Sequence, residues 1–151
     1  MRCWTLWVSL FLVVGLGAPA AAEPDCGAAD HAIIVHVNNV RSAAGLITAT
    51  VYGNKAEKFL KKEGKLVRVR VPARKGSVDI CLPVAKPGVY AVTVYHDENG
   101  NRDFDKSWFG IPEEGYGISN NPKIVLAPPD FSDAEFKAMN GRTRIDINVH
   151  Y

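Results

Sequence analysis

Residues 65–83 read KLVRVRVPARKGSVDICLP, and the fold is decided by how apolar and polar side chains alternate along this stretch. The apolar side chains occupy every second position, first at Val67, Val69 and Val71 and then at Val78, Ile80 and Leu82. A period of two is typical of a β-strand with one face buried and the other in water. Residues 73–76, which separate the two runs, include a glycine suited to a turn. The stretch therefore predicts two strands.

The same alternation recurs along most of the chain. We expect about seven strands, near residues 33–37, 46–52, 67–71, 78–82, 89–96, 123–127 and 145–151. Helical spacing is found at residues 54–63, and residues 130–139 are a second, shorter candidate. Short strands with regular turns and little helix predict an all-β fold, an antiparallel β-sandwich of the immunoglobulin-like kind.

The first 22 residues have the layout of a secretory signal peptide. Arg2 precedes an apolar run over residues 3–16, and Ala20 and Ala22 satisfy the small-x-small cleavage rule. A transmembrane anchor is the alternative, but the run is shorter than the about 20 residues that span a bilayer. We therefore expect cleavage after residue 22. The product is a single domain over residues 23–151, periplasmic or secreted and without a transmembrane segment.

Cleavage would also change the cysteine count. Cys3 leaves with the signal peptide, so the three cysteines of the whole chain become one pair, Cys26 and Cys81. An isolated pair in an oxidising compartment is expected to form a disulfide. Two free thiols are the alternative.

Charge is balanced in total but uneven along the sequence. The formal net charge of +2 argues against a protein that binds nucleic acid through bulk charge. Residues 55–75, called here the basic segment, contain nine basic and two acidic residues, whereas residues 97–136 contain nine acidic and three basic ones. The basic segment could contact an anionic surface or an envelope polymer, or it could be a solvated face with a protected edge strand.

Oxygen-bearing side chains alternate in the loop that begins at residue 97. They are Asp97, Asn99, Asn101, Asp103 and Asp105. Ca²⁺ takes six to eight oxygen ligands of this kind, so the loop is a candidate calcium site, with Glu113 or Glu114 as a later carboxylate ligand. The match to an EF-hand loop is partial, because positions six and twelve are Arg102 and Trp108 rather than Gly and Glu. A turn held by Asx hydrogen bonds is the alternative.

Aromatic and amide side chains follow this loop. Trp108, Phe109 and Tyr116, with Asn120 and Asn121, are what a surface that recognises a sugar or a peptide would use. Alternatively, the aromatic side chains bury themselves and fasten the loop to the sandwich.

Sequence motifs for catalysis are lacking. There is no Gly-x-Ser-x-Gly, no His-Glu-x-x-His and no phosphate-binding glycine loop. A hydrolase acting on an envelope polymer would have to use Asp97 with Glu113 or Glu114 as acid and base, beside His96. The sequence favours a non-enzymatic module over this alternative.

Four stretches resemble the DUF2141 family of uncharacterised exported bacterial proteins. They are residues 87–92 (PGVYAV), 96–101 (HDENGN), 109–121 (FGIPEEGYGISNN) and 131–134 (FSDA), and the likeness covers about residues 33–151. Ile118 departs from it, since the family is expected to have Phe there. The entry to the strand at residue 87 also resembles those of transthyretin-like sandwich domains. These resemblances imply a periplasmic or secreted β-sandwich that serves as a binding or structural module. Its partner is open, with an envelope polymer, a protein or an anionic surface as the candidates.

Overall fold

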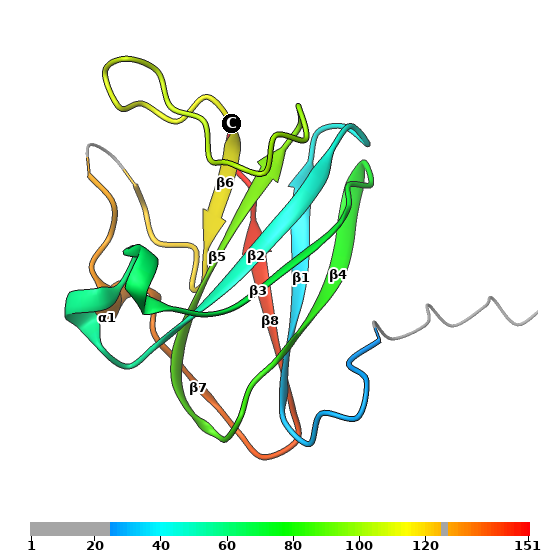
Figure 1. The fold of residues 1–151 in the computed structure, drawn as a ribbon, viewed down its shortest axis with the longest axis vertical. Coiled ribbons are helices and arrows are strands. Elements are labelled where there is room, and N and C mark those ends of the chain that lie inside the picture. The colour runs from blue at the N-terminus through cyan, green and yellow to red at the C-terminus, as the bar shows by residue number, and fades with distance from the viewer. Residues whose placement is uncertain (1–24, 125–126) are drawn as a thin grey trace, which may run out of the picture.

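Two β-sheets pack face to face in the computed structural model, which describes residues 25–124 and 127–151 (Figure 1). The strands of this part of the chain are β1 (Ala32–Val40), β2 (Leu46–Gly53), β3 (Lys65–Pro72), β4 (Gly76–Pro83), β5 (Gly88–Asp97), β6 (Gly115–Ile118), β7 (Phe136–Ala138) and β8 (Arg142–Asn148). One sheet has the order β4-β1-β8, and the other β3-β2-β5-β6, with β7 paired to the start of β5. The predicted all-β sandwich is confirmed.

One strand pair differs from the antiparallel arrangement expected throughout. β8 runs parallel to β1, from Ala32 opposite Arg142 to Asn38 opposite Asn148. The cause is the position of β7, which pairs with the start of β5 in the other sheet. From there the chain crosses the sandwich and enters β8 at the end where β1 also begins (Figure 1).

The core between the sheets is made of the alternating apolar residues. It contains the predicted inward positions of β1, Ile33, Val35 and Val37, together with Ile80 and Leu82 of β4. Val67, Val69 and Val71 of β3 pack against this core from the opposite sheet. The turn after β3 therefore carries the chain from one sheet to the other, and both halves of residues 65–83 face the same interior.

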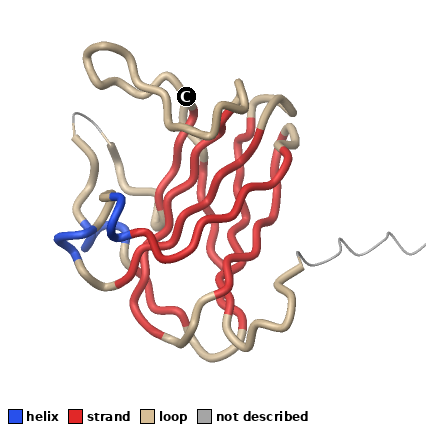
Figure 2. Tube along the Cα trace, in the orientation of Figure 1, coloured by secondary structure: helices blue, strands red, loops and turns tan. Residues whose placement is uncertain are grey.

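Helical structure lies on one side of the sandwich, whereas long loops gather at one end (Figure 2). The helical segment expected over residues 54–63 forms two 3-10 turns, η1 (Ala56–Lys58) and η2 (Lys62–Gly64), rather than one continuous helix. Leu60 between them has a φ of 61°, which no right-handed helix accommodates. The short helix α1 (Phe131–Ala134) falls within the second helical candidate. Phe59 and Phe131 pack edge to face, 5.6 Å between ring centroids, and cover the outer side of the larger sheet.

The strand expected at residues 123–127 does not form at its described positions, and residues 125 and 126 lie outside the described part. Two strands that were not expected, β6 and β7, form before and after this segment. β6 lacks apolar alternation because its inward positions are Gly115 and Gly117. A Cβ on Gly117 would lie 2.5 Å from the main-chain oxygen of Asn148, so only glycine lets β6 approach the other sheet this closely.

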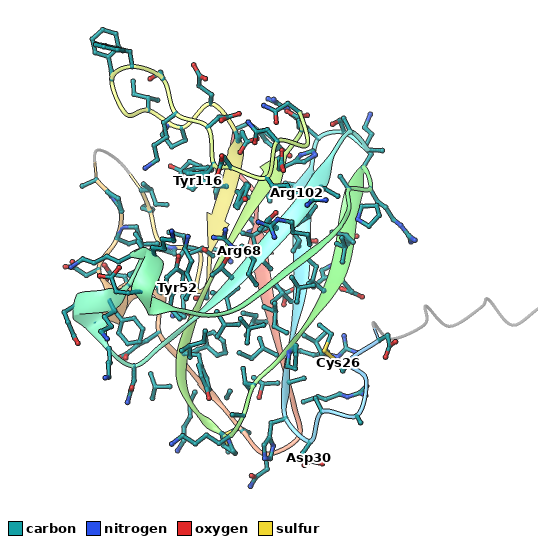
Figure 3. The ribbon with its side chains drawn as sticks, viewed as in Figure 1. Cys26, Asp30, Tyr52, Arg68, Arg102 and Tyr116 are labelled. Carbon is teal, nitrogen blue, oxygen red and sulfur yellow. A yellow bond between two sulfur atoms is a disulfide. The ribbon has the colours of Figure 1, made fainter. Side chains whose placement is uncertain are left out.

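Cys26 and Cys81 form a disulfide across 55 residues of sequence, as expected. With Ala32 and Ile34, the pair makes a small buried cluster on the outer side of the smaller sheet. Figure 3 labels Cys26 at the point where the N-terminal segment meets this sheet. The expected signal peptide lies outside the described residues. Within residues 25–124 and 127–151, no helix combines the length and the hydropathy that crossing a bilayer requires.

Removing the disulfide by the double substitution Cys26→Ser and Cys81→Ser is expected to lower the free energy of unfolding by about 2–4 kcal/mol, because the unfolded chain loses a long covalent loop. Urea unfolding measures the change. A thiol count on the denatured, unreduced chain from Glu23 to Tyr151, which lacks Cys3, is the control. Two reactive thiols in that count would contradict the disulfide.

Candidate functional site

Asp97 and Glu114 lie at the two ends of the loop that joins β5 to β6. Asp97 is the last residue of β5, and Glu114 directly precedes β6. The two strands are antiparallel with His96 opposite Gly115, so the next pair outward is Asp97 and Glu114. Pairing of the strands therefore brings together two carboxylates that are far apart in sequence. The register also selects Glu114 over Glu113 as the residue beside Asp97.

The first part of this loop, residues 97–105, is a network of side-chain hydrogen bonds. Asn99 and Asn101 each donate from Nδ2 to the carboxylate of Asp105, at 2.7 and 2.9 Å. Their own Oδ1 atoms accept from the main-chain N–H groups of Asn101 and Asp103, at 2.9 and 2.8 Å. The Asx turns considered for this loop are present. The bonds from Nδ2 gather three of the five predicted ligand side chains of residues 97–105, those of Asn99, Asn101 and Asp105.

Two carboxylate oxygens in this region are buried without a hydrogen-bond partner. Asp97 is 0% exposed; its Oδ2 accepts from the N–H of Arg102 at 2.8 Å, but its Oδ1 has no partner. Glu114 is 7% exposed; its Oε2 accepts from the N–H of Asp105 at 3.3 Å, and its Oε1 has no partner. A buried unpaired oxygen of a charged group is costly. A hydrogen-bond donor or a cation that paired with these two oxygens would therefore stabilise the folded protein.

The charges around Glu114 add to this cost. Burial, together with the nearby carboxylates of Asp97, Asp105 and Glu98, raises the pKa of Glu114 to about 7, although the main-chain hydrogen bond from Asp105 lowers it. Glu98 behaves in the opposite way. Hydrogen bonds from Arg41, one of them from Nε at 2.9 Å, hold the pKa of Glu98 at about 2. Glu98 is thus neutralised by a cation, whereas Glu114 is not.

The remaining predicted ligands point elsewhere. Asp103 is exposed, and its charge acts on Lys65 of β3. Glu113 is exposed, and its main-chain N–H donates to the carbonyl of Asp105 at 3.0 Å. Among the described residues, no group of three or more His, Cys, Asp or Glu side chains is arranged to hold a metal ion. A cation here would therefore need amide and main-chain oxygens as well as carboxylates.

His96 has a structural role. Its Nε2 donates to the carbonyl of Ala44 at 2.8 Å, so its Nδ1 accepts from the hydroxyl of Tyr151 at 2.6 Å. That hydroxyl in turn accepts from the N–H of Arg41 at 3.0 Å. Both ring nitrogens of His96 are occupied, and the ring is fully buried. The hydrogen bonds that join Arg41, His96 and Tyr151 have no signature in the sequence, because no local pattern links residues so far apart.

The predicted recognition residues separate into two groups. Trp108 and Phe109 are exposed, whereas Tyr116 is half-buried, with its ring 6.0 Å from that of Phe104 (Figure 3). Asn120 and Asn121 use their amides within the fold. Asn120 donates from Nδ2 to the carbonyl of Glu135 at 2.8 Å, and Oδ1 of Asn121 accepts from the N–H of Asn148 at 2.7 Å. These two residues brace the chain after β6, and the exposed aromatic surface is that of Trp108 and Phe109.

Residues 106–112 form a small hairpin, called here the tip hairpin. Lys106 pairs with Pro112 in an isolated bridge. Ser107 donates from its N–H to the carbonyl of Ile111 at 2.8 Å, and the N–H of Gly110 donates to the carbonyl of Ser107 at 2.8 Å. Main-chain bonds therefore set the shape of the hairpin, without help from the side chains of Trp108 and Phe109.

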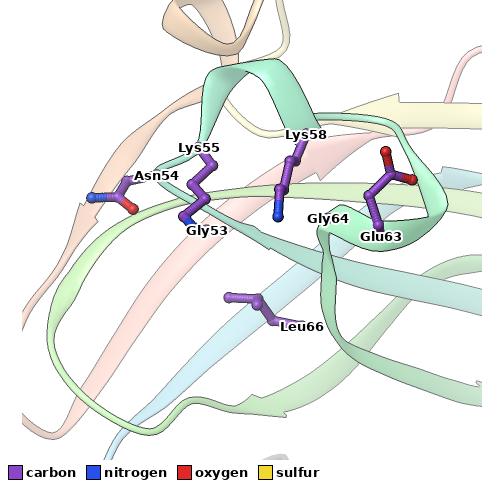
Figure 4. Close-up of a pocket in the computed structure, with 7 residues that line it drawn as sticks. All are labelled: Gly53, Asn54, Lys55, Lys58, Glu63, Gly64 and Leu66. Atoms are coloured by element: carbon purple, nitrogen blue, oxygen red, sulfur yellow. The ribbon is translucent and has the colours of Figure 1, made fainter.

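A cavity of about 230 Å³ lies apart from this loop, at the basic segment (Figure 4). It is lined by Gly53, Asn54, Lys55, Lys58, Glu63, Gly64 and Leu66. Nearby, burial and the charges of Arg68, Lys62 and Arg70 lower the pKa of Lys65. The fold thus concentrates positive charge along β3 and the 3-10 turns.

The raised pKa of Glu114 predicts a pH dependence for the metal-free protein. The folded state keeps this proton up to about pH 7, whereas the unfolded carboxyl loses it near 4.5, so the free energy of unfolding falls as the pH rises between these values. In chelator, the melting temperature should be lower at about pH 8 than at about pH 5, and Glu114→Gln should flatten this slope. Glu113→Gln is the matched control and should keep it. A wild-type melting temperature that does not change across this range would contradict the burial of Glu114.

Comparison with known proteins places the chain in a family. The family model described as "Uncharacterized protein conserved in bacteria (DUF2141)" matches residues 35–146, well over half of the chain. No curated protein and no solved structure gives a significant match. The matched region includes most of β1, all of β2 to β7, the loop with Asp97 and Glu114, and most of β8. The chain therefore belongs to the DUF2141 family.

Proposed function

We propose that this protein is an exported, non-enzymatic β-sandwich module that binds Ca²⁺ in the loop between β5 and β6. One observation carries the proposal: Asp97 Oδ1 and Glu114 Oε1 are both buried and both unpartnered, at the ends of paired strands. A divalent cation would satisfy both oxygens. It would also relieve the repulsion among Asp97, Asp105 and Glu114.

The ligands would come from side chains that the fold brings to one region, and the loop would have to rearrange to aim three carboxylates at one ion. Carboxylates of Asp97, Asp105 and Glu114 would supply the negative charge, and the amides of Asn99 and Asn101 would add neutral oxygens once their Nδ2 atoms turn away from Asp105. A main-chain carbonyl at residue 103 fits the seventh position of a loop counted from Asp97. This set of hard oxygen ligands suits Ca²⁺ rather than a transition metal. Bound calcium would order the loop and neutralise its charge.

A hydrolase is the second candidate, and the raised pKa of Glu114 is the observation in its favour, since a general acid needs such a pKa. Three features support the binding module instead. Asp97 and Glu114 are buried, both nitrogens of His96 are occupied, and Glu113 points into solvent. A polymer substrate would have to open the loop to reach either carboxylate.

Export and partners complete the proposal. The disulfide between Cys26 and Cys81 fits an oxidising compartment, the periplasm or the exterior of the cell. The concentration of positive charge around Lys65 supports contact of the basic segment with an anionic envelope polymer. Such contact would weaken as salt rises, because the Debye length shortens.

Calcium titration followed by thermal unfolding tests the proposal. A calcium concentration 100 times the Kd stabilises the folded state by about 2.7 kcal/mol, which raises the melting temperature by roughly 10 °C for a domain of this size. Asp97→Asn and Glu114→Gln should each remove most of the shift. Glu113→Gln, one residue away and exposed, should retain it.

The same variants separate the two candidate functions. A melting temperature that neither millimolar calcium nor chelator changes would exclude the calcium site. Hydrolysis of a cell-wall or glycan substrate by the wild type, lost in Glu114→Gln and kept in Glu113→Gln, would establish the hydrolase in place of the binding module.

A further inference from the structure

The tip hairpin carries three large apolar side chains with almost no protein around them. Trp108 is 96% exposed, Phe109 87% and Ile111 63%. Single exposed apolar residues are ordinary, but a contiguous group that includes tryptophan marks an interaction site. Elsewhere the loop packs an aromatic ring against the sandwich, since the half-buried Phe104 lies 5.4 Å from the ring of Tyr95. Exposure of the tip is therefore a local feature of residues 108–111.

We propose that the tip hairpin inserts into the interface of an anionic lipid bilayer when calcium occupies the loop at its base. The calcium dependence rests on the proposed function, whereas the exposure of the tip does not.

The shape and composition of the tip favour a bilayer as its partner. Small apolar ligands bind in concave sites, but this group sits on the turn of a hairpin that projects from the end of the sandwich (Figure 1). Tryptophan favours the boundary between hydrocarbon and headgroups, and a lysine just behind it can reach the headgroups. Lys106 occupies that place at the base of the hairpin. A bilayer can also receive a projecting hairpin without any pocket on the protein.

The base of the hairpin explains why calcium would control insertion. Asp105 directly precedes the hairpin, and Glu113 and Glu114 directly follow it. The main-chain bond from Glu113 to Asp105 holds its two sides together at this level. Without a cation, this concentration of carboxylates would be repelled by anionic headgroups. Calcium shared by Asp105 and Glu114 would remove that repulsion and fix the base from which the tip projects.

The processed chain offers a direct probe of the tip. The sequence has three tryptophans, Trp4, Trp7 and Trp108, and the first two leave with residues 1–22. Intrinsic tryptophan fluorescence of the chain from Glu23 to Tyr151 therefore reports only on the tip, and this chain contains every described residue.

The experiment mixes this chain with phosphatidylglycerol-containing vesicles and with neutral phosphatidylcholine vesicles, each in calcium and in chelator. We expect a blue shift of Trp108 emission, quenching by brominated lipid and co-sedimentation only with anionic vesicles in calcium. The double substitution Trp108→Ala and Phe109→Ala should weaken co-sedimentation about tenfold or more, because burial of both rings is lost. It should leave the calcium-induced rise in melting temperature unchanged. Leu66→Ser is the matched control, since Leu66 is 59% exposed on β3 and far from the hairpin in sequence.

Each result decides one part of the proposal. If calcium raises the melting temperature but Trp108 emission stays unshifted with both kinds of vesicle, insertion is overturned and the calcium site stands. If anionic vesicles bind the chain equally in chelator, calcium control is overturned. Loss of binding in Leu66→Ser, with the double variant at Trp108 and Phe109 unaffected, would assign membrane contact to the basic segment instead of the tip.

Discussion

The antiparallel pairing of β5 with β6 is the constraint on which the candidate site depends. Four residue pairs join these strands, from Thr93 opposite Ile118 to His96 opposite Gly115. This short ladder closes the loop between them and sets Asp97 beside Glu114, where both side chains are buried. The backbone hydrogen bonds of β5 and β6 thus hold two carboxylates close together, although their charges repel each other.

That pairing is itself supported by the opposite sheet. The N–H and carbonyl of Tyr116 bond reciprocally with those of His150, each at 2.9 Å, so the C-terminal end of the chain is attached to β6. Gly115 leaves room for the ring of Tyr151, whose hydroxyl bonds to His96. Glycine, tyrosine and histidine therefore form one packed unit beneath the carboxylates. The loop rests on rigid elements, as binding loops in general do.

The sequence predicted those parts of the fold that depend on local periodicity. Alternation identified β1 to β5 and β8, because half-buried strands need an apolar residue at every second position. It missed β6, whose inward residues are Gly115 and Gly117, and it did not predict the parallel pairing of β8, since register between distant strands leaves no local pattern. The site shows the same division. Spacing selected Asp97, Asn99, Asn101 and Asp105, but only strand register distinguishes Glu114 from Glu113. Nothing in the sequence indicates that Asn120 and Asn121 use their amides inside the fold.

The parallel pair of β1 and β8 also bears on how the molecule assembles. β1 is the first strand of the fold and β8 the last, so their contacts span more than a hundred residues of sequence. Contacts of such separation slow folding, because a long loop must close before they form. Until β8 pairs with β1, one edge of β1 has unpaired main-chain groups, and such an edge can pair with another chain. The disulfide to Cys81 joins the segment before β1 to β4, on the opposite edge of β1. Oxidation of the cysteines could therefore precede completion of the sheet, and would hold β1 and β4 together as a template onto which the C-terminal strand docks last.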